Sequence, residues 1–503
     1  MSDVPEDWAA LLGDYQARIQ RAGRMGGEDK LARRAAAKLP NAREAIALLT
    51  DVDSFVELGR LVGSVEDIPC DALVGGLARI NGRPVVVAVE DFTTKGGSIG
   101  HGANAKRVRL ARLARQERLP YILLLDGAGA RVTNSLERHP YAPSDLIELA
   151  QLPGLVPTVA VIFGSSAGHG ALSGVMMDFV VMTRDASLFS AGPPLVAAAL
   201  GEMVTKEQLG SAQMHVSVSG VAHNMVEDTA EACALVRRYL GHLPGNAWQH
   251  PPRASGDDQG PRRLDDILSV VPRDAQRPYD IRQVIRRLVD ADSFLELQPM
   301  YGRSIVMGLA HLGGQSIGIV ANQPTMYAGS ITHDAALKAA HFVDLANSFH
   351  LPVLFLADNP GIMSGSKAEQ AGTLRAAARL YTAQARLKSP KLHVTLRKAF
   401  GFGSSVMGMN PFDNQSITLA FPGVTLGGIP ARGGDSAARV DAETAARLAE
   451  AEAQGSWTTA DTMAFDDVID PRELRNVLLQ ALQHSRARLE LPVEPVTMPV
   501  LGP

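Results

Sequence analysis

Two apolar runs in the chain end in an aspartate, and a glycine-containing turn follows each of them. The first reads YILLLDGAGARV at 121–132, and the second reads LPVLFLADNPGIM at 351–363. A short continuous apolar run bounded by turn residues is typical of a strand that is buried on both faces. The pattern therefore predicts two interior strands, at 121–126 and 353–358, each of which stops at a tight turn.

The two runs are parts of a tandem repeat. Asp358 follows Asp126 by 232 positions, and Lys338 follows Lys106 by the same interval. Self-similarity that is this long and collinear indicates two copies of one fold, because solenoid repeats have periods of about 20–50 residues.

Longer segments also match between the two halves. LTDVDSFVEL at 49–58 matches LVDADSFLEL at 288–297, and FGSSAGHGA at 163–171 falls opposite KAFGFGSSV at 398–406. Between the halves, residues 243–263 are rich in Pro, Gly and polar residues, which is the composition of a linker. We therefore place the boundary near residue 255, with domains at 1–255 and 256–503.

Both halves show the same order of predicted elements. A strand pair comes first, then a helix, the interior strand, a second helix and a further strand that ends in a Gly-rich turn. In the two halves the strand pairs are at 76–89 and 307–322, the helices at about 103–118 and 334–349, and the further strands at 158–163 and 392–396. Alternating strands and helices predict an α/β fold with a parallel sheet, whose sites lie at the carboxyl ends of the strands.

The two Gly-rich turns, at 164–170 and 401–404, are the strongest candidates for chemistry. Glycines let a ligand approach the backbone, and a strand–turn–helix unit can aim free N–H groups at a developing oxyanion. Tight packing alone also explains glycines in a single turn, but two turns at matched positions favour two oxyanion holes for two carbonyl-bearing ligands. We find no H-E-x-x-H or P-loop motif, so no metal site is expected, and the chemistry is expected to rest on backbone donors and not on a catalytic triad.

Composition limits the other function classes. The 503 residues carry a net charge of −4, which gives no reason to expect nucleic acid or an anionic membrane as partner. Only Cys70 and Cys233 are present, too few for a disulfide framework or a four-cysteine zinc site. No signal-peptide pattern or apolar stretch of roughly 18 residues is found. A cytoplasmic protein without a metal is therefore expected.

One predicted helix is crowded with basic residues. Arg107, Arg112, Arg115 and Arg118 share a broad face at helical spacing. A solvated helix face is the simplest interpretation, and a phosphate-binding patch is the alternative.

Several motifs resemble those of the carboxyltransferase β subunits of biotin-dependent acyl-CoA carboxylases, the propionyl-CoA and methylcrotonyl-CoA carboxylase type. They include DFTTKGGSIG at 91–100, SGVAH at 219–223, ANQP at 321–324, DNPGIMSGSKAEQAG at 358–372 and RKAFGFGSSVM at 397–407. The segment at 37–58 is similar to the N-terminal signature of that family. The resemblance covers about residues 25–440.

The resemblance implies tandem duplicated crotonase-like (ClpP/crotonase) domains, an active site at a dimer interface, and a homohexamer that is a trimer of dimers. It implies transfer of CO2 from carboxybiotin to the α-carbon of an acyl-CoA, through enolates of both ligands. The chain has no Met-Lys-Met biotinylation site and no ATP-binding carboxylase region. Biotin is therefore expected on a separate biotin carboxyl carrier or biotin carboxylase subunit.

The resemblance also assigns residues. Gly168 and His169 would hold the thioester carbonyl, and Phe402 and Gly403 the ureido carbonyl of biotin. Further contacts would come, on the substrate side, from Gly129, Ala130, Ala167 and Ser405, and on the biotin side from Gly401 and Ser404.

The chain departs from the family pattern at both turns. The family has Gly-Pro-Cys-Ala-Gly-Gly where this chain has Gly-Ser-Ser-Ala-Gly-His, so His169 replaces a glycine. At the second turn the family has Gly-Gly-Ala where this chain has Gly401-Phe402-Gly403. Residues 126–131 read DGAGAR, where the family has DSGGAR. His169 would line a changed acyl pocket, donate a hydrogen bond or pack. The alternatives to carboxylation are a biotin-linked acyl-CoA decarboxylase and a non-catalytic β-like subunit.

Overall fold

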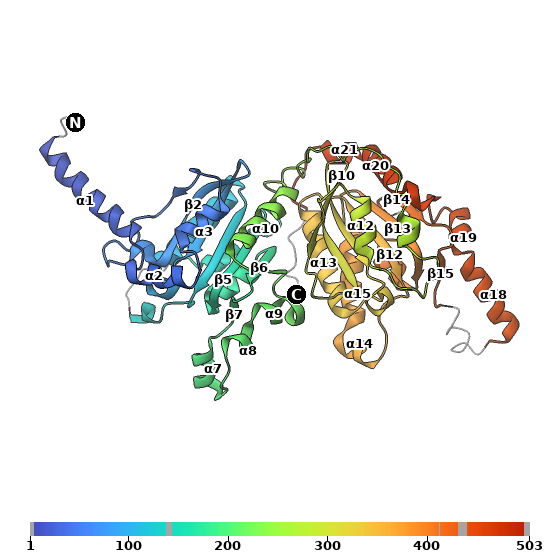
Figure 1. The fold of residues 1–503 in the computed structure, drawn as a ribbon, viewed down its shortest axis with the longest axis horizontal. Coiled ribbons are helices and arrows are strands. Elements are labelled where there is room, and N and C mark those ends of the chain that lie inside the picture. Colours follow the sequence, from blue (N-terminus) through green and yellow to red (C-terminus); the bar gives the residue numbers. More distant parts are fainter. Residues whose placement is uncertain (1–4, 137–142, 412, 431–439, 497–503) are drawn as a thin grey trace. The chain divides into compact units, whose positions relative to one another are not determined.

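The computed structural model describes residues 5–136, 143–411, 413–430 and 440–496. They form two compact units, Met1–Leu240 and Gly241–Pro503 (Figure 1). The expected linker belongs to the second unit, since the Ala254 N–H donates to the Gly314 carbonyl at 2.8 Å. The domain limits of 1–255 and 256–503 stay a prediction.

The first unit is built on one mixed sheet. Its strand order is β1-β2-β3-β4-β5-β6-β8, and β7 pairs with β5. Neighbours from β3 to β8 are parallel, whereas β1, β2 and β3 are antiparallel. The strands are β1 Val56–Glu57, β2 Leu73–Ile80, β3 Arg83–Glu90, β4 Tyr121–Gly127, β5 Thr158–Ala167, β6 Phe179–Thr183, β7 Ser187–Phe189 and β8 Asn224–Val226.

The second unit repeats this sheet. Its order is β16-β14-β13-β12-β11-β10-β9, with β15 paired to β13. The hairpin and β9 are again antiparallel, and the rest is parallel. The strands are β9 Leu295–Leu297, β10 Ile305–Leu312, β11 Gln315–Asn322, β12 Val353–Asn359, β13 Lys391–Phe400, β14 Gln415–Ala420, β15 Thr425–Gly427 and β16 Asp467–Val468.

Helices connect the parallel strands in both units. From the N-terminus to the end of the first sheet they are α1 Glu6–Gly23, α2 Glu28–Ala36, α3 Ala42–Leu49, α4 His101–Glu117, α5 Asp145–Leu149, α6 Gly168–Val175, α7 Pro193–Leu200, α8 Lys206–Gly210, α9 Ala212–Met214 and α10 Thr229–His242. Later helices are α11 Ile267–Val270, α12 Ile281–Leu288, α13 His333–Ser348, α14 Ser366–Ala371, α15 Thr373–Ala385, α16 Phe402–Val406, α18 Ala442–Ala453, α19 Gly455–Asp461, α20 Leu474–His484 and α21 Arg486–Glu490. The predicted strands and helices are confirmed.

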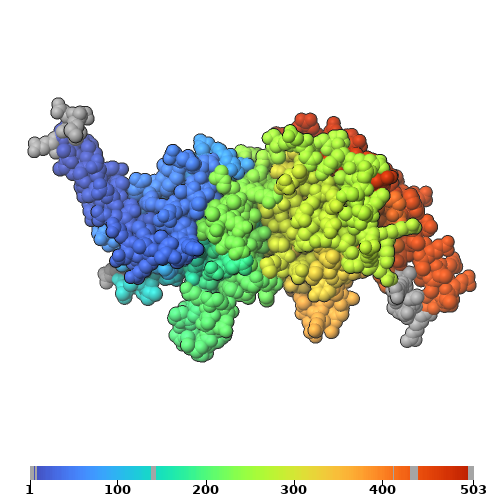
Figure 2. All heavy atoms as spheres, viewed as in Figure 1, coloured from blue at the N-terminus to red at the C-terminus, as the bar shows by residue number. Residues whose placement is uncertain are grey.

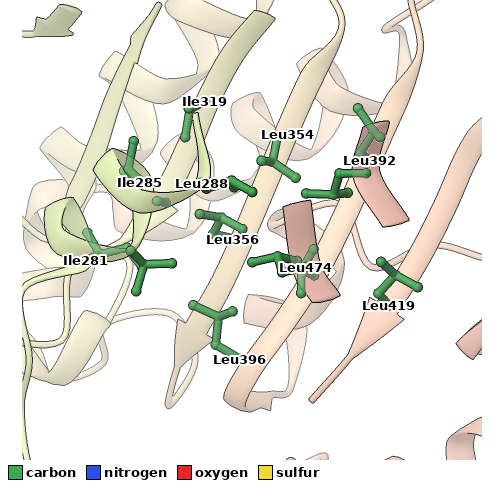
Figure 3. Close-up of a cluster of buried hydrophobic side chains, with 14 of the residues drawn as sticks. Ile281, Ile285, Leu288, Ile319, Leu354, Leu356, Leu392, Leu396, Leu419 and Leu474 are labelled. Atoms are coloured by element: carbon green, nitrogen blue, oxygen red, sulfur yellow. The ribbon is translucent and has the colours of Figure 1, made fainter. Parts of the chain in front are cut away.

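Periodicity explains how helices cover the sheet. In α12, Ile281, Ile285 and Leu288 recur on one face, and all three are fully buried. Figure 3 shows them packed over the central strands of the second unit, next to Leu354 and Leu356. Burying each such side chain stabilises the fold by about 1.5–3 kcal/mol.

The repeated sequence motifs are structural anchors. Asp51 accepts hydrogen bonds from the N–H groups of Asn81 and Gly82, at 3.0 and 2.7 Å, and so fixes the β2–β3 turn. Asp290 does the same for the β10–β11 turn. Lys106 and Lys338, both buried, donate to carbonyls just before or at the start of each hairpin.

Strands β5 and β13 run further than the sequence predicts. Their expected ends were Phe163 and Leu396, whereas the strands continue to Ala167 and Phe400. Each strand changes partner along its length: β5 leaves β6 and pairs with β7, and β13 leaves β14 and pairs with β15. The second partner keeps the backbone extended, and the turns therefore begin at Gly168 and Gly401.

Two features are absent from the residues that the structure describes. No helix there is long and apolar enough to cross a membrane. No group of three or more His, Cys, Asp or Glu residues among them is arranged to hold a metal ion.

One buried carboxyl group makes the stability of the first unit depend on pH. Burial raises the pKa of Asp178 to about 7, although hydrogen bonds from the Thr158 hydroxyl and N–H act to lower it. Because the folded chain keeps this proton to a higher pH than the unfolded chain, its contribution to stability falls as pH rises from about 4 to 7. We expect D178N to remove up to about 4 kcal/mol of that dependence. Thermal unfolding at pH 5 and pH 7 measures it, with D185N, at an exposed site, as control. Equal slopes in D178N and the unsubstituted protein would contradict the assignment.

Candidate active site

The first candidate site lies where β4 and β5 end. Gly168, with φ of +53°, turns the chain from β5 into α6. The loop after β4 lies against this turn: a Cβ atom on Gly129 would sit 2.6 Å from the Ala167 carbonyl oxygen and 3.6 Å from the His169 nitrogen. Ala130 is bridged to Ile99 on its other side. Backbone therefore packs on backbone, without a side chain between the two loops.

The first turn of α6 has no side-chain cap. The leading N–H groups of a helix have no partner within that helix, and they carry a partial positive charge. Ala167 precedes α6 and offers no side-chain cap. The N–H groups at Gly168 and His169 are thus suited to bind an oxygen that gains negative charge.

The second candidate site repeats this arrangement at the ends of β12 and β13. Gly401, also with φ of +53°, leads into α16, which has no side-chain cap either. A Cβ atom on Gly403 would lie 2.1 Å from Asn359 Oδ1 and 2.7 Å from the Gly361 Cα. Only glycine leaves room for the loop after β12 at this point.

The remaining residues assigned at the second turn lie on α16. Phe402 is 74% exposed. Ser404 Oγ donates to the Gly401 carbonyl at 2.8 Å, and the Ser405 carbonyl accepts from Asn410 Nδ2 at 2.9 Å. The structure thus gathers Gly401, Phe402, Gly403, Ser404 and Ser405 at one turn, whereas Gly129, Ala130, Ala167, Gly168 and His169 gather at the other.

A buried aspartate–arginine pair supports each site. Asp126 Oδ2 lies 2.6 Å from Arg34 Nη1, and its Oδ1 accepts from the Ser165 N–H at 3.1 Å. Asp358 Oδ2 lies 2.7 Å from Arg397 Nε. Burial raises the pKa of both aspartates, although the arginine beside each acts to lower it. The pairs hold the ends of β4 and β12 in place.

The first site also lies on a buried chain of charges. His169 Nε2 is 2.6 Å from Asp145 Oδ1, and Arg107 Nε donates to Asp145 Oδ2 at 2.7 Å. Arg107 Nη1 is 3.2 Å from Glu90 Oε1. Burial raises the pKa of Glu90 to about 7. Burial acts to raise the pKa of Asp145 too, but hydrogen bonding to His169 and the charge of Arg107 outweigh it and keep that pKa below its usual value.

The prediction of a solvated arginine face was wrong for Arg107, which is fully buried. A signal was available, because Arg107 stands four residues from both Ala103 and Ala111 on the apolar stripe of α4. Arg112 pairs with Glu148 at 2.8 Å. The sequence reasoning missed Asp145 and Glu90, since neither belongs to a recognisable motif.

Comparison with known proteins agrees with this geometry. A family model for the carboxyl transferase domain matches residues 39–494. The chain is 32% identical over 484 residues to the methylmalonyl-CoA decarboxylase subunit alpha of Veillonella parvula, with 94% of each chain covered. It is 34% identical over 411 residues to the mitochondrial propionyl-CoA carboxylase beta chain of Sus scrofa, which covers 79% of this chain and 74% of that one.

A solved structure matches the whole fold. It is the transcarboxylase 12S hexamer with methylmalonyl-coenzyme A and methylmalonic acid bound, at a TM-score of 0.89 and 29% identity, covering 99% of this chain and 100% of that one. The two sheets with duplicated topology are those of this fold. The chain therefore belongs to the carboxyl transferase family, and it is an acyl-CoA carboxyltransferase with tandem crotonase-like domains.

Proposed function

We propose that the chain is the carboxyltransferase subunit of a biotin-dependent acyl-CoA carboxylase, with acyl-CoA at the first turn and biotin at the second. The single observation that carries the assignment of sites is the pair of uncapped helix starts, α6 and α16, at matched ends of two duplicated sheets. The family model and the acyl-CoA carboxylase relative favour this function over the decarboxylase and the non-catalytic subunit.

The residues of the chain have defined tasks in this proposal. The N–H groups of Gly168 and His169 donate to the thioester oxygen as negative charge develops there. Those of Phe402 and Gly403 donate to the ureido oxygen of biotin. When bound, carboxybiotin supplies the carboxyl group and the base for the α-carbon. Both turns donate through the backbone, so the side-chain replacements at His169 and Phe402 leave the donors in place.

Gly129, Ala130 and Ala167 form the wall behind the thioester in this proposal, because their backbone lies against the start of α6. Gly401 and Ser404 shape the biotin turn through the hydrogen bond between them. Ser405 is the α16 residue proposed to contact the acyl group.

We further propose that biotin arrives on a separate carrier or biotin carboxylase subunit, and that the chain assembles as a homohexamer, a trimer of dimers. The named hexameric assembly of the 12S structure supports this. So does an exposed apolar segment: Figure 2 shows α7 and α8 (green) projecting from the body of the first unit, and Leu195, Leu200 and Met203 there are 61%, 75% and 86% exposed. Exposed apolar clusters of this kind mark protein interfaces.

The first test concerns chemistry at the second turn. Run in reverse, the proposed transfer releases CO2 from a malonyl-type or methylmalonyl-type thioester only when free biotin is added. We expect G403A to lower this rate by about 100-fold or more, because the new Cβ would displace the turn that carries the donors.

G428A serves as the matched control, since a Cβ there meets no atom within 4 Å. CO2 release is followed for both variants, and circular dichroism checks that each is folded. The proposal fails if the folded unsubstituted protein shows no biotin-dependent release with any thioester of the panel, or if G403A and G428A behave alike.

The second test concerns assembly. We expect the double variant L195D/L200D to form smaller species than the hexamer of the unsubstituted protein, because it places charges at two exposed apolar positions of α7. Light scattering after size exclusion measures the mass. V52D, at a site that is 91% exposed, is the control. A monomeric unsubstituted protein, or a hexamer that survives both α7 substitutions, would count against this interface.

A further inference from the structure

Each Gly-rich turn carries one ring side chain between two glycines, His169 in the first turn and Phe402 in the second. The two rings have different surroundings. His169 Nε2 lies 2.6 Å from Asp145 Oδ1, and 24% of the His169 side chain is exposed. Phe402 is 74% exposed. The first ring is therefore anchored inside the protein, whereas the second ring lies on the surface.

The second unit lacks the residues that anchor the first ring. In the first unit, Arg107 donates from Nε to Asp145 Oδ2 at 2.7 Å and holds that acid in place. At the repeat interval of 232 residues, Ala339 stands in place of Arg107, and Ala377 in place of Asp145. The second unit therefore has no charged group at these two positions.

A second exposed apolar side chain borders the turn of Phe402. Strand β15 pairs with the end of β13, and the Gly401 N–H donates to the Gly427 carbonyl at 2.9 Å. A Cβ atom on Gly401 would lie 3.0 Å from the carbonyl oxygen of Gly428. The next residue, Ile429, is 69% exposed. The residues that follow β15 thus run beside the turn.

The first turn has the same frame with smaller side chains. A Cβ atom on Gly168 would lie 3.5 Å from the carbonyl oxygen of Ser190, which therefore takes the place of Gly428. The next residue is Ala191, which is half-buried, at the position of Ile429. Of the two turns, only the one assigned to biotin carries large, exposed apolar side chains at these positions.

Covalent geometry places the side chain of Phe402 beside the proposed donor. Its Cβ atom is two bonds from its own backbone nitrogen, so a ligand oxygen bound by that N–H lies within van der Waals reach of the side chain. In biotin, the ureido oxygen lies at one end, and the tetrahydrothiophene ring and the valeryl chain are apolar. Ligand sites commonly combine a few polar groups that fix orientation with an apolar lining.

We propose that Phe402 and Ile429 form an apolar contact for the tetrahydrothiophene ring and valeryl chain of biotin, and so determine how tightly the second turn binds it. This rests on the proposed function, which places the ureido oxygen at the N–H groups of Phe402 and Gly403. The backbone donors fix the ureido group. The two side chains add affinity for the rest of the molecule, because they remove its apolar surface from water.

The test compares biotin with 2-imidazolidone, which is the ureido ring alone. Ligand-observed NMR titrations with the full-length protein give the dissociation constant of each ligand. We expect F402A to raise the dissociation constant of biotin by about 10-fold, and I429A to raise it less. Both variants keep the backbone donors, so the dissociation constant of 2-imidazolidone stays unchanged. In the CO2 assay, we expect the KM for free biotin to rise in F402A while kcat is unchanged, which is the pattern of a lost binding contact.

F92A is the matched control, because Phe92 is a phenylalanine of the first unit that is 46% exposed. We expect F92A to bind both ligands as the unsubstituted protein does. If F402A binds biotin as tightly as F92A does, the contact is overturned, while biotin-dependent CO2 release leaves the proposed function standing. Equal loss of biotin and 2-imidazolidone in F402A overturns it too, since the turn itself is then disturbed. If the unsubstituted protein binds neither ligand and releases no CO2 with biotin, the proposed function fails, and this inference fails with it.

Discussion

Both candidate sites depend on a buried carboxylate that is neutralised by arginine at the end of a central strand. Asp126 with Arg34, and Asp358 with Arg397, hold the loops that lie against the two helix starts. A buried pair of this kind is a weak source of net stability, but removal of one partner costs about 3–5 kcal/mol because an unpaired charge remains. The pairs therefore act as fixed points. With the strand end held, the next loop can approach the turn closely enough for backbone to contact backbone.

Duplication gives the chain two copies of the same sheet, but the residues around the two turns differ. The anchors are the same in kind: Asp51 and Asp290 hold the hairpin turns, and Lys106 and Lys338 hold the loops before them. The surroundings of the turns differ, with a buried ionic network in the first unit and alanines in the second. Backbone donors alone suffice to hold an oxyanion, so this difference in side chains leaves the donors of both turns in place.

The order of elements was predictable because it follows from local patterns. Continuous apolar runs mark strands buried on both faces, and the apolar stripe at helical spacing marks a helix such as α12. The repeat strengthened each assignment, since a pattern found once is ambiguous and a pattern found twice at one interval is not. The ends of β5 and β13 were not predictable. Each depends on a second partner strand, and the sequence of β5 or β13 does not show which strand that is.

The sequence by itself determined the duplicated α/β fold, the two Gly-rich turns and the family resemblance, because glycine, apolar runs and collinear motifs leave local signatures. Only the tertiary structure decided what surrounds His169. Asp145 precedes it by 24 positions and Arg107 precedes Asp145 by 38, so nothing in their spacing indicates that they meet. They meet because adjacent parallel strands bring the following loop and helix to the same edge of the sheet. There, a buried charge is stable only beside its counterion.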